Sequence, residues 1–176
     1  NSYPNGTELF MGYSNATTGA AGSAQADRMI GRTHIHFDTS SLPDGATIIS
    51  ARLRFYGHTT YVKSTGDSNS VGVLTESTYP AAQPVSVTGF PDYGPYDAYA
   101  LSYFGSTELA PRMTYAAWTD GAYNDFVLNS SGLAAINKTG HTRFGIRQAC
   151  DFDNVEPVGG GARFLYGYAS DETGTS

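Results

Sequence analysis

The stretch HIHFDTSSLPDGATIISARLRFYG, residues 34–57, decides the fold because it holds two alternating runs around one turn. Apolar and polar residues that alternate with a period of two are typical of a strand with one buried face. The intervening Pro-Asp-Gly, residues 43–45, has the composition of a tight turn. We therefore expect two strands joined by a turn. The inward faces would carry Thr33, Ile35 and Phe37 in the first run and Ile49, Ala51, Leu53 and Phe55 in the second.

Two histidines, His34 and His36, lie on the outward face of the first run. They could offer two nitrogen ligands to a metal ion, but a zinc site needs three or four convergent ligands. A third would have to come from His58 or a carboxylate, and nothing in the sequence places one there. Because alternation already accounts for both histidines, we interpret them as residues of an outer sheet face, like Arg52 and Arg54 on the second run.

The rest of the chain repeats this pattern of short alternating runs, with turn residues between them and almost no helical periodicity. It predicts an all-β fold: a two-layer antiparallel β-sandwich, jelly-roll-like, in a single domain over residues 1–176. The further strands are expected at residues 8–14, 70–77, 125–129, 142–150 and 162–170.

One short helix is predicted near residues 130–137, in SSGLAAINKTG. Serines can cap its start and Gly140 can end it. Leu133, Ala134 and Ile136 would pack inward. Cys150, the single cysteine, excludes an internal disulfide, and we expect it as a small buried residue at the end of a strand.

A long tyrosine-rich segment, residues 77–116, interrupts the pattern and is expected to be a loop. Its rings could stack on sugar faces or anchor a protein partner, and the alternative is that they pack over the sandwich as a small core. Outward arginines could attract an acidic polysaccharide. The residues expected to bind a glycan or partner are Tyr93, Tyr96, Tyr99, Tyr103, Arg52 and Arg54.

Charge and hydropathy exclude two classes of partner. The net charge is −6 and no basic cluster exceeds two residues, so nucleic acid is not expected. No apolar run reaches the roughly 18–20 residues of a membrane-spanning helix, so membrane insertion is not expected. The chain begins NSYPNG without a methionine, and we interpret it as a processed piece of a longer protein.

The acidic stretch CDFDNVEP suggests a structural calcium site with Asp151, Asp153 and Asn154 as oxygen ligands. The alternative is that these residues cap turns. Two carboxylates two residues apart could also resemble a glycosidase pair, but nothing nearby suggests a raised pKa in either, and the chain has no nucleophile-elbow motif. We therefore expect no enzyme activity and no required cofactor.

Four glycosylation sequons occur, a mild excess over chance. Asn129 and Asn137 flank the predicted helix, where capping explains them. Asn5 and Asn15 are the better glycan candidates.

Several motifs resemble DNRLRE-type domains, which are carbohydrate-binding-module-like. FDTSSLPDGATIISARLRFYG is similar to the core signature of that family, and Phe37, Asp38, Ser41, Leu42, Pro43, Ala46, Ile48 or Ile49, Ala51 and Leu53 fill its places. AYNDFVLNSSGLAAINKTGHTRFGIRQACDFDN and FLYGYASDETGTS continue the likeness to the end of the chain. The resemblance implies a jelly-roll-like extracellular module that binds or adheres and carries no catalytic motif.

This sequence departs from the family in ending at Gly-Thr-Ser, where members continue into a final strand. An exposed sheet edge beside Phe164 would then invite a strand from another subunit. We expect a non-catalytic module at an extracellular, cell or virion surface that binds polysaccharide or mediates adhesion. The alternative is a structural subunit of an extracellular filament or virion surface, in contact with other copies of itself and completed by a neighbour's strand.

Overall fold

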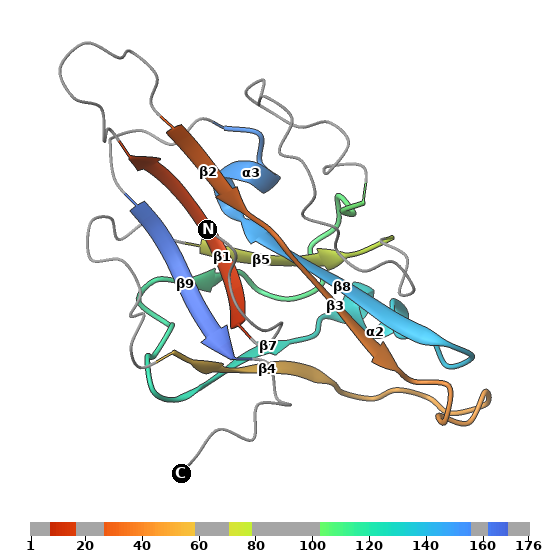
Figure 1. Ribbon diagram of the computed structural model, residues 1–176. Coiled ribbons are helices and arrows are strands. Elements are labelled where there is room, and N and C mark those ends of the chain that lie inside the picture. The colour runs from red at the N-terminus through yellow and green to blue at the C-terminus, as the bar shows by residue number, and fades with distance from the viewer. Residues whose placement is uncertain (1–7, 17–26, 59–70, 79–102, 156–161, 169–176) are drawn as a thin grey trace, which may run out of the picture.

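The computed structural model describes residues 8–16, 27–58, 71–78, 103–155 and 162–168, and the side chains of residues 8–30 and 162–164 are not described. Within these ranges two antiparallel sheets pack as a sandwich (Figure 1). The prediction of a two-layer all-β sandwich is confirmed.

The larger sheet has five strands in the order β2-β1-β9-β4-β7. All of its neighbouring strands run antiparallel, as expected where hairpins and longer returns connect them. Its strands are β1 (Glu8–Ala16), β2 (Asp27–Gly31), β4 (Arg52–Gly57), β7 (Tyr123–Val127) and β9 (Ala162–Tyr168).

The smaller sheet has four strands in the order β3-β8-β5-β6 and is also antiparallel. The last strand in this order, β6, is very short, and two of its residues pair with β5. The strands are β3 (Thr33–Asp38), β5 (Val71–Glu76), β6 (Met113–Thr114) and β8 (His141–Gln148).

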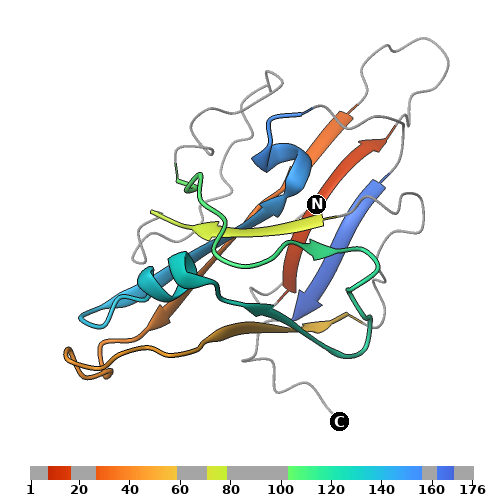
Figure 2. The ribbon, with the colours of Figure 1, turned by 180° about the vertical axis from the view of Figure 1, so that it is seen from behind.

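Consecutive strands join the two sheets at both sides of the sandwich. Only Arg32 separates β2 from β3, so the chain crosses from the edge of one sheet to the edge of the other within one residue (Figure 1). At the opposite side β6 leads through residues 115–122 into β7, which is the other edge of the larger sheet (Figure 2). The surfaces left for binding are therefore the two outer faces, the ends and the strand edges.

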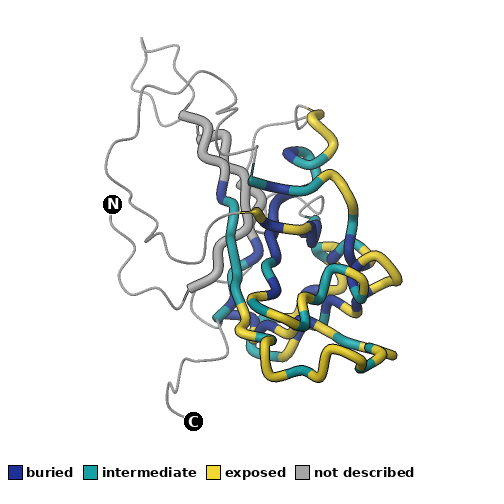
Figure 3. The backbone as a smooth tube through the Cα atoms, turned by 90° about the vertical axis from the view of Figure 1, so that its right-hand side faces the viewer, coloured by how far each residue is buried: buried dark blue, intermediate teal, exposed yellow. Residues whose placement is uncertain are grey.

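The core lies between the sheets, and Figure 3 shows buried residues gathered there, with exposed residues along the outer turns. Leu53 and Phe55 are buried, as their alternation predicted, and Ile35 packs against the same cluster. Phe37, at the end of β3, is 37% exposed and only its edge contacts a core ring, that of Phe144. Trp118 and Phe126 add the largest fully buried side chains.

The inward position predicted for Ile49 is wrong, since this side chain is 87% exposed. The strand begins at Arg52, three residues later than the alternation suggested. The register of β4 with β7 pairs Arg52 with Val127, which would place Ser130 opposite Ile49. Ser130 is already the first residue of a helix, so Ile49 has no partner strand.

Two details of the helix prediction are corrected. Helix α2 (Ser130–Ala134) is capped by Asn129, whose side chain accepts a hydrogen bond from the N–H of Gly132, and not by a serine. It ends well before Gly140. Leu133 and Ile136 pack against the core as expected, but Ala134 is exposed.

The strand end expected at Cys150 is instead a second short helix, α3 (Ala149–Phe152). Gln148 caps it by accepting a hydrogen bond from the N–H of Ala149. Cys150 is partly buried in this helix. The four residues of α3 are too few to show a helical pattern in the sequence. Contacts from distant parts of the chain, described below, hold them in place.

The expectation of a loop over residues 77–116 is wrong for its last part. Leu109 and Ala110 are core residues, and the N–H of Leu109 donates to the carbonyl of Leu74 on β5. β6 follows directly. Residues 79–102 lie outside the described residues.

At Phe164, where an unpaired edge was expected, strand β1 of the same chain pairs with β9 on one side. β9 lies between β1 and β4, with Phe164 opposite Gly12 and Gly167 opposite Gly57.

No helix within the described ranges is long and apolar enough to cross a membrane.

Candidate functional site

The outer face of β4 and β7 gathers arginine and tyrosine side chains at one edge of the larger sheet. Alternation turns every second residue of each strand outward, and antiparallel pairing sets the two outward rows side by side. Arg54 lies opposite Asp125, and Tyr56 lies opposite Tyr123. We call this surface the Arg–Tyr face; it consists of Arg52, Arg54 and Tyr56 of β4 and Tyr123, Asp125 and Val127 of β7.

Two arginines hold one carboxylate on this face. Arg54 donates from Nε to Asp125 Oδ1 at 2.6 Å and from Nη2 to Oδ2 at 2.9 Å, and Arg52 Nη1 donates to Oδ2 at 3.2 Å. The hydrogen bond from Arg54 is the main cause that lowers the pKa of Asp125, and the same bond raises the pKa of Arg54. With two cations and one anion, the group keeps one net positive charge and several unused N–H donors.

Two tyrosine rings border this charged group. Tyr56 and Tyr123 meet edge to face, with ring centroids 5.2 Å apart and an interplanar angle of 78°. The Arg54 guanidinium lies 5.2 Å from the Tyr123 centroid, within cation–π range. Tyr123 is 67% exposed and Tyr56 36% exposed, so both rings remain available to a ligand.

The sequence predicted only Arg52 and Arg54 of this face as binding residues. Tyr56 lies two residues after Arg54 in the same alternating run, but no role was predicted for it. Tyr123 and Asp125 were missed because no local pattern reveals which strand pairs with β4, and that pairing brings them there.

The tyrosines expected to share this role do not join the face within the described residues. Tyr93, Tyr96 and Tyr99 lie outside the part of the chain that the structure describes. Tyr103 is partly buried, and its carbonyl accepts a hydrogen bond from the N–H of Thr78, next to β5 of the other sheet. Of the described members of the predicted set, Tyr103 lies beside the smaller sheet, whereas Arg52 and Arg54 lie on the larger one.

The acidic residues proposed as calcium ligands are held by arginines. Asp151 is buried and receives two hydrogen bonds from Arg32. Asp153 receives two from Arg112, Nη1 to Oδ2 and Nη2 to Oδ1, both at 2.7 Å. The hydrogen bonds from Arg112 are the main cause that lowers the pKa of Asp153. Asn154 is exposed and has a positive φ of 52°, which fits a turn residue.

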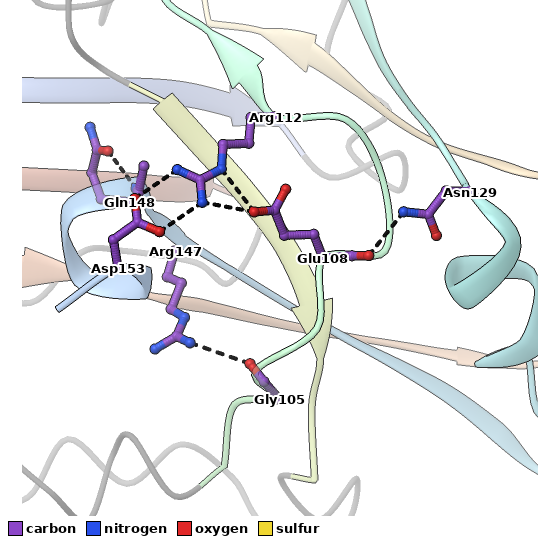
Figure 4. A network of polar contacts seen from close by, with 8 residues as sticks. Gly105, Glu108, Arg112, Asn129, Arg147, Gln148 and Asp153 are labelled. Atoms are coloured by element: carbon purple, nitrogen blue, oxygen red, sulfur yellow. Dashed lines mark hydrogen bonds and ion pairs between the residues drawn. The ribbon is translucent and has the colours of Figure 1, made fainter.

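The Arg112–Asp153 pair belongs to a network that connects residues 105–112 to β8 and α3 (Figure 4). Arg112 bridges Asp153 and Glu108, and Arg147 donates to the carbonyl of Gly105 at 3.3 Å. Asn129 adds a bond from Nδ2 to the carbonyl of Glu108. Arginines thus pair with both acidic residues, and no group of three or more His, Cys, Asp or Glu side chains that could hold a metal ion occurs among the described residues. Structural calcium stays a prediction.

His34 and His36 lie on the outer face of the smaller sheet, as alternation predicted, but the His34 ring is partly covered. It stacks on Phe104 with centroids 4.3 Å apart, and its Nδ1 lies 2.7 Å from Ser77 Oγ. Burial, aided by the nearby charges of His36 and Arg32, lowers the pKa of His34 to about 4. A neutral imidazole is thus favoured here at physiological pH.

The described sequons lie in different surroundings. Asn129 caps α2, and the Asn137 side chain accepts bonds from the N–H and hydroxyl of Thr139. Both are exposed. Asn15 lies in β1, and Asn5 lies outside the described residues. Glycosylation stays a prediction for all four.

Comparison with protein-family models, curated proteins and solved structures finds no match to this chain. The resemblance to DNRLRE-type domains therefore stays a prediction that depends on the motifs quoted above.

Proposed function

We propose that this chain is a non-catalytic, extracellular binding module that holds a glycan on the Arg–Tyr face. The observation that supports this proposal most is the exposed Tyr123 ring, which lies edge to face with Tyr56 and beside the Arg54–Asp125 pair. An aromatic ring offers a flat apolar surface to the C–H face of a sugar. Guanidinium N–H groups donate to sugar hydroxyls, and the carboxylate accepts from them.

A non-catalytic role is supported by the state of the acidic pair. Asp151 and Asp153 are each bound by a different arginine, so neither is presented as a free acid or base beside the other. If the chain nonetheless hydrolysed a polysaccharide, loss of turnover in Asp151→Asn or Asp153→Asn would identify the pair as catalytic.

A glycan array probed with the purified chain tests the proposal, followed by calorimetric titration of any hit. We expect Tyr123→Ala to weaken binding by about tenfold, since it removes the stacking surface. Tyr123→Phe keeps the ring and should bind nearly as well. Ile49→Ala removes an exposed apolar side chain that is not part of the Arg–Tyr face and serves as the control. An array without hits, or binding that Tyr123→Ala leaves unchanged, would refute this function.

A structural subunit that contacts copies of itself is the second candidate, and the edge of β7 supports it. The N–H of Leu128 donates to Ala51 and that of Gly57 to Ala122, so even-numbered residues of β7 face β4. The backbone groups of Tyr123, Asp125 and Val127 therefore point away from the sheet, and no described residue pairs with them. An open edge of this kind can accept another strand.

Size-exclusion chromatography with multi-angle light scattering separates the two candidates. A concentration-dependent dimer or polymer that Val127→Pro abolishes would favour the subunit, because the N–H of Val127 points away from β4, and proline removes this edge donor without breaking a bond to β4. A monomer that still binds a glycan favours the module.

A further inference from the structure

Arg143 on β8 differs from the other arginines whose side chains are described, because no carboxylate of the described residues pairs with it. Its Nε is buried and has no hydrogen-bond acceptor among the described residues. A guanidinium keeps its charge at all physiological pH values, and leaving a buried donor unsatisfied is costly. The other five are paired: Arg32 and Arg147 with Asp151, Arg52 and Arg54 with Asp125, and Arg112 with Glu108 and Asp153.

Arg143 lines a polar hollow at the end of the smaller sheet, whereas the Arg–Tyr face belongs to the larger sheet. The hollow has a volume of about 210 Å³ and opens to solvent. This is less than the roughly 300–1,000 Å³ of pockets for drug-sized ligands, so it suits a small molecule or one group of a larger one. Its polar lining residues are Glu76, Ser77, Thr78, Asn137, His141 and Arg143.

A partly buried histidine lies next to Arg143 on the β3 side. His36 lies directly opposite Arg143 across the strand pair, and its Nε2 is also buried without a described partner. Burial lowers the pKa of His36 most, and the positive charges of Arg143 and His141 lower it further. The carboxylate of Asp38, which lies opposite His141, accepts hydrogen bonds from the hydroxyl and the N–H of Ser40. The fixed positive charge that an anion would meet here at pH 7 is therefore that of Arg143 itself.

The hollow also contains one acidic group, Glu76, which is exposed. No ion pair joins Glu76 to Arg143 within the described part of the chain, although both line the same space. Asn137 uses its Oδ1 for Thr139, so its amide nitrogen is the group left to donate. The lining thus presents cationic and amide donors together with one carboxylate acceptor.

We propose that this hollow binds a small carboxylic acid that carries a hydroxyl or amino group, its carboxylate on Arg143 and its donor on Glu76. The planar fork of arginine matches a carboxylate with two parallel hydrogen bonds. Glu76 repels an anion without a donor and accepts from one that has it. The proposal goes beyond the glycan function and does not depend on it, because the two sites lie on different sheets.

Amide NMR titration of the ¹⁵N-labelled chain tests this site with sodium glycolate, acetate and sulfate at constant ionic strength and pH 7. Glycolate carries both groups, acetate lacks the hydroxyl, and sulfate lacks the planar carboxylate. We expect saturable glycolate shifts at Ser77, Thr78 and Asn137 in the millimolar range. Acetate should bind about threefold to tenfold more weakly, since it cannot donate to Glu76.

Three variants assign the groups. Arg143→Gln should reduce glycolate affinity by about tenfold or more, and Arg143→Lys should weaken it less because the charge remains and only the fork is lost. Glu76→Gln should remove the preference for glycolate over acetate. Arg52→Gln deletes the same charge from the other sheet and should leave the titration unchanged.

Three other outcomes of the titrations would show that the hollow does not bind a hydroxy acid in this way. No saturable shift at these amides, an equal response to sulfate, or glycolate shifts that persist in Arg143→Gln would overturn the proposal. If Arg143→Gln loses its dispersed spectrum, the comparison is made with Arg143→Lys, and an unchanged affinity there counts against it equally.

Discussion

Arg32 and Asp151 form a bidentate ion pair that ties the crossing between the sheets to helix α3. Arg32 donates from Nε to Oδ2 at 2.8 Å and from Nη2 to Oδ1 at 2.6 Å. The side chains are 12% and 2% exposed, and Arg147 Nη1 lies 3.9 Å from the same carboxylate. Residues 119 positions apart in the sequence are thus joined where β2 passes into β3.

Asp151→Asn should strongly destabilise the fold. It leaves two poorly solvated guanidinium groups without their counter-charge, and removing one partner of a buried pair costs about 3–5 kcal/mol. Urea denaturation followed by Trp118 fluorescence measures the loss. Asp153→Asn is the matched control: its pair with Arg112 is exposed, so the cost should stay within about 1 kcal/mol. Equal losses for both variants would mean that burial of the first pair is unimportant.

Gly132→Ala in α2 should destabilise the protein, contrary to the usual effect in a helix. In an exposed helix interior this change stabilises by about 1 kcal/mol. Here an added Cβ would clash with the carbonyl oxygen of Leu109 and would lie 2.9 Å from Cβ of Leu128. Overpacking of this kind costs about 1–3 kcal/mol.

Ser131→Ala, one residue earlier and exposed, is the control for Gly132→Ala and should change stability by less than about 0.5 kcal/mol. Thermal and urea unfolding of the two variants provide the comparison. A Gly132→Ala protein more stable than the parent would show that residues 109 and 132 are not packed this closely.

Alternation predicted the sandwich because burial on one face of a strand is a local signal, as the buried Leu53 and Phe55 show. Alternation failed at Ile49 because a strand also needs a partner. At the level of Ile49, strand β7 has already ended and helix α2 has begun. β6 could not be predicted for the same reason, since its two residues are ordered by pairing with β5. Sequence periodicity thus locates faces better than ends.

The candidate site was only half predictable. Arg52 and Arg54 could be placed outward from their own strand, but their shared partner Asp125 lies 73 and 71 residues away. The interpretation of Asp151 and Asp153 as a pair also assumed that neighbours in sequence act together. In the fold each one is bound by a different arginine from a distant segment.

Stability should fall as the pH is lowered from about 6.5 toward 4, and His34 should cause part of this fall. Its folded-state pKa of about 4 lies below the ordinary 6.5, with burial as the main cause. Between these values the unfolded chain binds a proton that the folded chain does not, so unfolding is favoured by acid. His34→Gln should flatten the curve of unfolding free energy against pH in this window.

Ser77→Ala is the control for the pH effect of His34. It removes the hydroxyl beside His34 Nδ1 and should lower stability by about 1 kcal/mol at every pH. The slope between pH 6.5 and 4 should remain, because burial and neighbouring charges rather than Ser77 lower the pKa of His34. An unchanged slope in His34→Gln would assign the effect to other groups, such as His36, whose pKa is also lowered.

Asp125→Asn should make the Arg–Tyr face more selective for acidic glycans. The change removes one negative charge from a group with two arginines, so its net charge rises from +1 to +2, and Arg52 and Arg54 gain free donors. Affinity electrophoresis in gels with a sulfated or a neutral polysaccharide measures the result. We expect stronger retardation by the sulfated polymer alone, with a steeper dependence on salt. Asp153→Asn removes the same charge elsewhere and should not alter retardation. Equal gains for neutral and sulfated polymers would show that Asp125 acts through shape and not through charge.

In the unmodified chain the lowered pKa of Asp125 keeps the carboxylate charged, so binding should not change from pH 7 down to about pH 4.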